Sequence, residues 1–203
     1  MINVLIDTDV ILDFFFDRKP FSVDSAKILS MCETQKINGF ITPVIYSNTY
    51  YLLRQTAQHD KVIKKLKVLL SITDVLIMDK EVVIQSLNSG FTDFEDALQN
   101  YSAVKHGNIK AIITRNIKDY RHSSIGAVTP ENYLKIINAS RKHRVIRLSG
   151  RSVLDFSVSS RFQLRSYRAI RTRLRKPTQR ISANVTCNRY NSDVNLFNKC
   201  LVA

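Results

Sequence analysis

The sequence predicts an α/β fold in which a mostly parallel sheet of four to five strands is flanked by helices. Short apolar runs rich in β-branched residues alternate with helical patterns along the first 140 residues. Several of these runs end directly in an acidic or polar residue, as at Asp7 and Thr114. Parallel sheets of this kind bind ligands beyond the carboxyl ends of their strands, so the residues after each run are the first candidates for a site.

The beginning of the chain is expected to form two strands and two helices. Residues 2–6 are apolar and β-branched, which is typical of a buried parallel strand, and residues 10–16 follow as a short helix. Ser22 is placed to cap a second helix that reaches about residue 35. Residues 39–42 then form the second strand, which a proline ends.

The middle of the chain continues the alternation. Residues 44–58 and 60–70 have the apolar spacing of helices, and residues 74–78 form a third strand. Residues 80–89 return to a helical pattern that ends near Gly90. Because strands and helices still alternate here, a sheet covered on both faces remains the expected architecture.

The next helix carries clear start and stop signals. Thr92 and Glu95 match a capping box, with Thr92 as the N-cap and Glu95 at the third helical position. The helix should run to about His106, where Gly107 provides a C-terminal stop. Residues 109–114 form the fourth strand.

The predicted fold closes with a fifth strand and a last helix. Ala127 and Val128 add the strand, and Pro130 occupies the favoured first position of a helix that reaches about Asn138. The five glycines lie far apart in the chain, so neither a dinucleotide fingerprint nor a P-loop is present.

Composition indicates a cytoplasmic protein. No apolar run approaches the roughly 20 residues of a membrane helix, so no membrane association is expected. The N-terminus has neither a basic segment nor a small-residue cleavage site, which argues against a secretory signal. The three cysteines, Cys32, Cys187 and Cys200, show no metal-ligand spacing and cannot all pair, which fits a reducing compartment.

Charge divides the chain in two. Residues 1–140 hold 16 Lys and Arg against 15 Asp and Glu, a net charge of +1. Residues 141–203 hold 15 against 2, a net charge of +13, and favour arginine. We therefore expect a folded domain over residues 1–140 and an Arg-rich basic tail over residues 141–203. The tail could be an RNA-binding arm, a disordered segment or a non-native extension, and the abrupt change in composition favours the last.

The first acidic cluster follows the first strand. Asp7 and Asp9 flank Thr8 at the carboxyl end of residues 2–6. Thr8 or Asp9 could simply cap the following helix. For Asp7 a functional role is favoured, because burying an unpaired carboxylate is costly and a metal ion would offset that cost.

The second cluster is at the start of the helix near residue 94. Asp93 and Asp96 are three residues apart and share one face with Asn100. Like charges at this spacing repel, which suggests a nearby cation. Alternatively, acids in a first turn complement the helix dipole, an explanation that suits Asp93 better than Asp96.

The third cluster follows the fourth strand, where Thr114, Asn116 and Asp119 offer oxygen donors, although such residues also favour ordinary turns. Together with Asp7 and Asp96, Asp119 supplies hard oxygen ligands from distant segments, which suit Mg²⁺ or Mn²⁺. Ions held by carboxylates commonly activate water for phosphodiester hydrolysis.

These motifs resemble those of PIN domains, over residues 1 to about 138. The similarity lies in residues 4–13, residues 93–99, residues 113–120 and the helix that contains Asn48. The resemblance implies a Rossmann-like sheet, a Mg²⁺ or Mn²⁺ cofactor and endoribonuclease activity on RNA. Many bacterial members are toxins that a small antitoxin protein inhibits, and they are often homodimers.

By position, Asp7 matches the first acid of the family and Asp96 the third, while Asn116 or Asp119 matches the fourth. Asn48 stands where the family usually has Glu, and Asn116 where it often has Asp. The loss of two formal charges should weaken metal affinity. A catalytically weak PIN-like module that binds RNA or protein is therefore the alternative, followed by another α/β chemistry such as a phosphatase-like or response-regulator-like protein.

The expected roles follow from this assignment. Asp7 and Asp96 ligate the metal, and Asp119 is a ligand or a water-orienting acid. Asn48 and Asn116 are neutral ligands or hydrogen-bond to the substrate. The supporting residues are Asp9, Asp93, Thr8 and Thr114; of these, Asp93 would support the ligands, and the two threonine hydroxyls would orient a metal-bound water or a phosphate.

Overall fold

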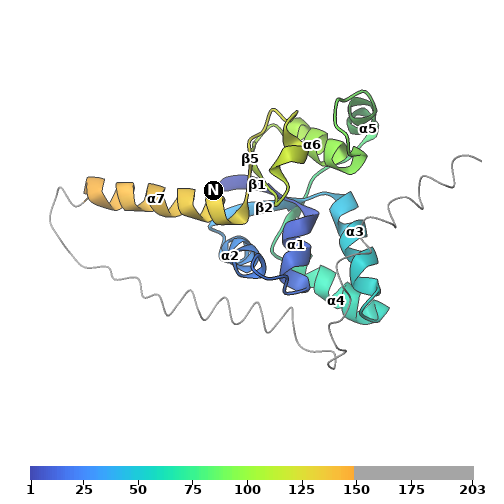
Figure 1. Ribbon diagram of the computed structural model, residues 1–203, viewed down its shortest axis with the longest axis horizontal. Helices are drawn as coiled ribbons and strands as arrows, with labels where there is room; N and C mark the ends of the chain where they lie inside the picture. Colours follow the sequence, from blue (N-terminus) through green and yellow to red (C-terminus); the bar gives the residue numbers. More distant parts are fainter. Residues whose placement is uncertain (149–203) are drawn as a thin grey trace, which may run out of the picture.

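A computed structural model describes residues 1–148, with side chains to residue 139, and shows a five-stranded parallel sheet in the order β3-β2-β1-β4-β5 (Figure 1). The strands are β1 (Ile2–Ile6), β2 (Ile37–Ile41), β3 (Asp74–Val75), β4 (Ile109–Ile113) and β5 (Ala127–Val128). The predicted fold class is therefore confirmed, including the short fifth strand.

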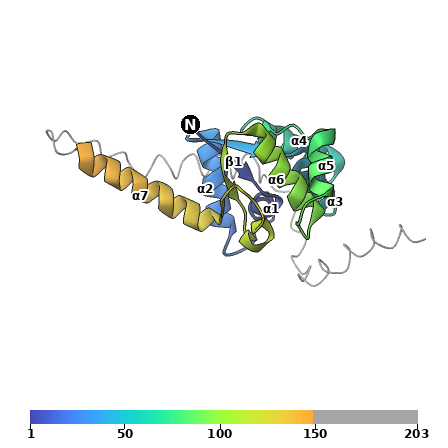
Figure 2. The same ribbon diagram turned by 90° about the horizontal axis from the view of Figure 1, so that it is seen from above.

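The helices follow the strands in the expected alternation. They are α1 (Thr8–Phe15), α2 (Ser22–Glu33), α3 (Pro43–Arg54), α4 (His59–Leu70), α5 (Lys80–Leu87), α6 (Phe94–His106), the 3₁₀ helix η1 (Ile117–Tyr120) and α7 (Pro130–Leu148). Figure 1 shows α5 and α6 on one side of the strands and α1 and α2 on the other, while α7 projects from the body there and in Figure 2.

Strand β1 lies at the centre of the sheet and of the core. Val4, Leu5 and Ile6 are fully buried, as are Ile112 and Ile113 in the adjacent β4. Leu5 is in register with Phe40 of β2 on one side and with Ile112 on the other. Because all strands run in the same direction, their carboxyl ends meet at one edge of the sheet, called here the carboxyl edge.

Helices α2 and α7 differ from the expectation, and strand β3 ends at Val75, short of the predicted residue 78. Helix α2 starts at Ser22, and the preceding Phe21 makes no side-chain cap, so Ser22 is the first helical residue and not the N-cap. Helix α7 continues to Leu148, about ten residues beyond the predicted end and past the predicted domain boundary. The expectations for residues 149–203, which form most of the basic tail, lie outside the described residues.

Within residues 1–148, no helix is both long enough and apolar enough to cross a membrane.

Candidate active site

Asp7 is the best-buried carboxylate of the carboxyl edge. Its backbone N–H donates to the carbonyl oxygen of Ile113 at 3.0 Å, which continues the pairing of β1 with β4. Its carboxylate accepts the Thr114 hydroxyl at 2.7 Å and the Thr8 backbone N–H at 2.6 Å. Asp7 is therefore itself the N-cap of α1, a role that the sequence suggested for Thr8 or Asp9.

Burial, together with the nearby charge of Asp9, raises the pKa of Asp7 to about 6. Hydrogen bonds from Thr114 and Thr8 act in the opposite direction, because they favour the ionised carboxylate. The side chain is only 7% exposed. An ionised Asp7 thus lacks much of the compensation that water would give, and a cation could supply it.

Asp96 lies in the first turn of α6. Burial, together with the charges of Asp7, Asp93 and Asp119, raises its pKa to about 8. The Tyr120 hydroxyl donates to Asp96 Oδ1 at 3.1 Å and partly counters the increase. The structure therefore brings Asp96 close to carboxylates that are far from it in the chain, and their charges repel its own.

Helix α6 begins differently from the prediction. Asp93 is the N-cap, and its carboxylate accepts the backbone N–H groups of Glu95 at 2.7 Å and Asp96 at 3.3 Å. The predicted capping box of Thr92 and Glu95 is wrong. Asp93 caps as well as threonine does, and moving the start by one residue frees Glu95 for another contact.

Glu95 contacts the predicted site residue Asn48. The Asn48 side-chain amide donates to Glu95 Oε2 at 2.5 Å, which links α3 to α6. Burial raises the pKa of Glu95, while the bond from Asn48 lowers it. The structure thus pairs Asn48 with an acid that the sequence analysis had assigned to capping.

Asp119 and Asn116 form the exposed side of the site. The Asn116 side-chain amide donates to Asp119 Oδ2, and its backbone N–H donates to Thr114 Oγ1 at 3.0 Å. Burial raises the pKa of Asp119, and the charges of Asp93 and Asp9 raise it to a smaller extent. Thr114 consequently connects the loop after β4 to Asp7.

Two buried residues were missed by sequence reasoning. Gln99 is 2% exposed and Tyr120 3% exposed, and the Tyr120 hydroxyl is 3.1 Å from Gln99 Oε1. The Gln99 side chain also hydrogen-bonds to Asp7. Gln99 is three residues after Asp96 and therefore on the same helix face, which is the one sequence signal that could have identified it.

Arg115 joins the site to α1. Its guanidinium contacts Asp13 at 3.1 Å and Asp9 at 3.4 Å, and it lies over the Phe21 ring at 4.9 Å from the ring centre. Asp13 is 1% exposed and also has Arg18 at 3.7 Å. Asp9 is thus shared between the acidic cluster and this ion-pair network, and it has no direct bond to Asp7.

The donor set fits a hydrated hard cation. Asp7, Asp96 and Asp119 offer carboxylate oxygens, and the buried Thr8 hydroxyl has no hydrogen-bond partner. Among the side chains described, no group of three or more His, Cys, Asp or Glu is arranged so that it could hold an ion. Mg²⁺ characteristically retains several waters and uses one or two carboxylates, so it does not need such a group.

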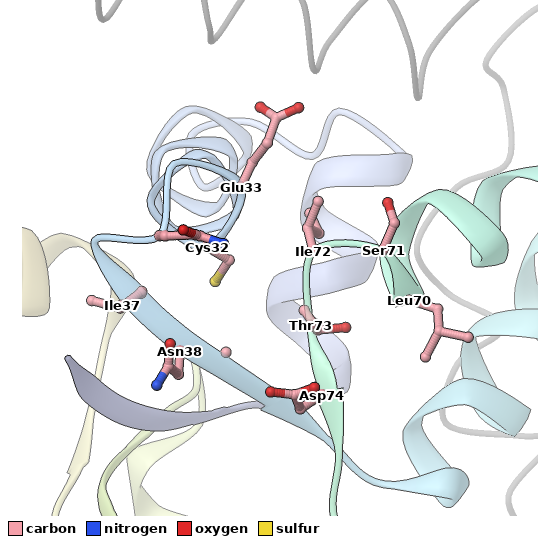
Figure 3. A pocket seen from close by; sticks show the side chains of 11 residues that line it. Cys32, Glu33, Ile37, Asn38, Leu70, Ser71, Ile72, Thr73 and Asp74 are labelled. Atoms are coloured by element: carbon pink, nitrogen blue, oxygen red, sulfur yellow. The ribbon is translucent and has the colours of Figure 1, made fainter.

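A hollow of about 230 Å³ lies elsewhere, beside the amino ends of β2 and β3 (Figure 3). Cys32 from α2 directs its sulfur toward β2, and Thr73 and Asp74 lie across from it. This edge carries none of the predicted site residues.

The fold can be compared with known proteins. A solved structure of FitAB bound to an IR36 DNA fragment matches with a TM-score of 0.50 and 13% identity, over 63% of this chain and 94% of that one. VapBC2 from Rickettsia felis bound to a promoter DNA fragment scores 0.48 at 11% identity, over 63% and 98% of the two chains. VapBC-1 from nontypeable Haemophilus influenzae scores 0.48 at 13% identity, over 64% and 99%.

At these identities the FitAB likeness concerns the fold alone. None of the curated proteins compared with the chain matches it. A family model described as PIN domain matches residues 3–118, which is more than half of the chain and includes β1, β4 and the acids between them. The chain therefore belongs to the PIN domain family.

Proposed function

We propose that the chain is a metal-dependent endoribonuclease that hydrolyses RNA phosphodiester bonds with Mg²⁺ or Mn²⁺. The observation that carries this proposal is that Asp7, Asp96 and Asp119 lie at the carboxyl edge, where burial and the charges of neighbouring acids raise the pKa of each carboxyl. Carboxylates collected in this way are stabilised by a cation. RNA as the substrate is what the PIN resemblance implies.

Asp7 and Asp96 would hold the cation, which when bound would supply an activated water and stabilise the leaving oxygen. Thr114 fixes one oxygen of Asp7, and the Thr8 hydroxyl is available to a water or a phosphate. Asp119, held by Asn116, would orient the attacking water.

Asn48 acts in this proposal through Glu95, whose carboxylate it binds. Asp93 supports the site by capping α6 and thereby fixing the position of Asp96. Asp9 is expected to hold the positive charge of Arg115 beside the acidic cluster through their ion pair.

A second candidate is a PIN-like module that binds RNA or protein without cutting. The observation in its favour is that Asn48 and Asn116 are neutral, and both side chains are occupied by neighbouring carboxylates. In that case the acidic edge would bind a cation weakly and would not support turnover.

We further propose that the protein acts in the cytoplasm as a toxin that a small antitoxin partner inhibits, and that it is a homodimer. These proposals rest on the resemblance to toxin-type PIN domains. Residues 1–140 would form the nuclease domain and residues 141–203 an appended basic segment, as the charge distribution indicates.

The test is cleavage of bacterial total RNA by the full chain with Mg²⁺ or Mn²⁺, and with EDTA as the metal-free control. Asp7→Asn and Asp96→Asn should abolish cleavage. Asp24→Asn should not, because the Asp24 carboxylate is paired with Lys27 within α2. Metal-dependent cleavage that persists in Asp7→Asn would overturn the site, and a folded, metal-loaded chain that does not cleave would favour the binding module.

A further inference from the structure

Two buried polar side chains connect the two best-buried acids of the site. Tyr120 of η1 places its hydroxyl 3.1 Å from Asp96 Oδ1 and 3.1 Å from Gln99 Oε1. Gln99 in turn hydrogen-bonds to the carboxylate of Asp7. A continuous chain therefore runs from Asp7 through Gln99 and Tyr120 to Asp96.

The directions of these bonds follow from the groups involved. A glutamine side chain offers one acceptor oxygen and one donor amide. Because Gln99 Oε1 faces the Tyr120 hydroxyl, its amide group is the part that donates to Asp7. The tyrosine has one hydroxyl hydrogen, which Asp96 and Gln99 share. Both carboxylates thus accept from neutral donors that are themselves bonded to each other.

Burial makes this chain rigid. Gln99 is 2% exposed and Tyr120 is 3% exposed, so neither group can exchange its partners for water. Tyr120 also packs edge-on against Phe91, with ring centres 6.4 Å apart. Buried amides and hydroxyls are retained where their hydrogen bonds are satisfied, and here the partners are the acids of the site.

We propose that Gln99 and Tyr120 are positioning residues that fix the orientation of the Asp7 and Asp96 carboxylates toward a divalent cation. This inference rests on the proposed function, since the cation is the ion that the nuclease would use. Groups that orient the ligands of a metal typically change metal affinity 10–100-fold when they are removed. Gln99 and Tyr120 touch neither substrate nor cation and act through the two acids.

The experiment measures Mn²⁺ binding to the full chain by calorimetry, together with the melting temperature in EDTA and in Mn²⁺. Tyr120→Phe removes only the hydroxyl, and we expect Mn²⁺ to bind about 10–100-fold more weakly. The rise in melting temperature on adding Mn²⁺ should shrink with it. Gln99→Leu should weaken binding in the same direction, even if it also lowers the melting temperature in EDTA.

Tyr46→Phe is the matched control. The Tyr46 hydroxyl also makes one 3.1 Å hydrogen bond, to Thr73, but it lies away from the acids. It should lower the melting temperature in EDTA and in Mn²⁺ equally and leave Mn²⁺ affinity unchanged.

The outcomes separate the two proposals. A folded Tyr120→Phe protein with native Mn²⁺ affinity would overturn the positioning role while leaving the nuclease intact. A native chain that binds Mn²⁺ but cuts no RNA would overturn the nuclease, and the comparison of variants would still decide the positioning role. A native chain that binds no Mn²⁺ would overturn both.

Discussion

The two edges of the sheet use polar residues in opposite ways. At the carboxyl edge, Asp7 and Asp96 are held among other acids, with pKa values of about 6 and about 8. At the amino edge, polar groups such as Glu33 border a hollow of about 230 Å³, and beneath them Cys32 packs against Gly39. The carboxyl edge holds carboxylates that repel one another, whereas the residues at the amino edge mainly pack against each other.

This difference shows why the shape of a surface is a poor guide to function here. The hollow at the amino edge is the more obvious concavity, but its lining carries none of the predicted site residues. The carboxyl edge is recognised by chemistry, since three acids there resist ionisation for the same physical reason. If this distinction is right, equivalent substitutions at the two edges should have different consequences.

The largest difference should come from removing one carboxylate at each edge. Asp7→Asn should reduce RNA cleavage at least about 100-fold, because a metal ligand should matter no less than the groups that orient it. Glu33→Gln should leave cleavage within about twofold of the native rate, since Glu33 lines the hollow beside the amino end of β2. Initial rates on the same RNA check this, and equal losses in both variants would contradict the distinction between the edges.

The pH dependence of stability should differ in the same way. The pKa of Asp7 rises from 3.8 to about 6 on folding, so the folded chain binds its proton more tightly. Its contribution is fully present below pH 3.8 and disappears as the pH rises through about 6. The difference corresponds to about 3 kcal/mol in the free energy of unfolding.

This effect is measured by urea denaturation in EDTA between pH 4 and pH 8, with Asp7→Asn as the comparison. The native chain should lose stability relative to the variant as the pH increases, and added Mg²⁺ should reduce the loss. Parallel plots of unfolding free energy against pH for the two proteins would show that ionisation of Asp7 does not destabilise the fold.

In the middle of β2, beside the hollow, Gly39→Ala should affect stability only. A Cβ at Gly39 would lie 2.6 Å from Cys32 Sγ and 2.8 Å from Ile6 Cδ1, so side chains must move. We expect the free energy of unfolding to fall by about 1–3 kcal/mol, with cleavage per folded molecule unchanged.

Gly126→Ala is the control, because nothing lies within 4 Å of the added methyl group. Adding Cys32→Ala to the Gly39→Ala protein should recover part of the lost stability, because it removes the sulfur that the new methyl group would meet. A stable Gly39→Ala protein with reduced cleavage would mean that the amino edge influences the site.

The smallest effect is expected where α3 meets α6. Asn48→Ala removes the hydrogen bond to Glu95 and should cost about 1 kcal/mol or less in stability. A double-mutant cycle of Asn48→Ala with Glu95→Ala, followed by denaturation, isolates the interaction of the two side chains. If the two stability changes simply add in the double variant, the Asn48–Glu95 contact contributes no interaction free energy.

The sequence predicted those features that depend on local pattern. Asp7 and Thr114 were identified because each directly follows a strand, and parallel strands bring such positions together. The alternation of elements likewise predicted the parallel sheet. The strand order β3-β2-β1-β4-β5 needs tertiary contacts and was not predicted.

The rest depended on differences that the sequence pattern does not resolve. Thr92 and Asp93 are both good N-caps, and choosing the wrong one placed Glu95 in the cap and left Asn48 without its partner. Gln99 and Tyr120 were missed because a single sequence does not show which polar residues are buried, and only Gln99 had a signal, its place on the helix face of Asp96. Their role emerges only from the partners that folding provides.

The packing of Cys32 has a practical consequence for kinetics. Burial raises the pKa of this thiol to about 12 and leaves it 4% exposed, so at neutral pH it is both protonated and shielded. An alkylating reagent can therefore react with it only after α2 has separated from the sheet. With Cys187 and Cys200 replaced by serine, the rate of alkylation reports how often the fold opens around Cys32. Cation binding at the opposite edge should lower this rate to the extent that the two edges open together.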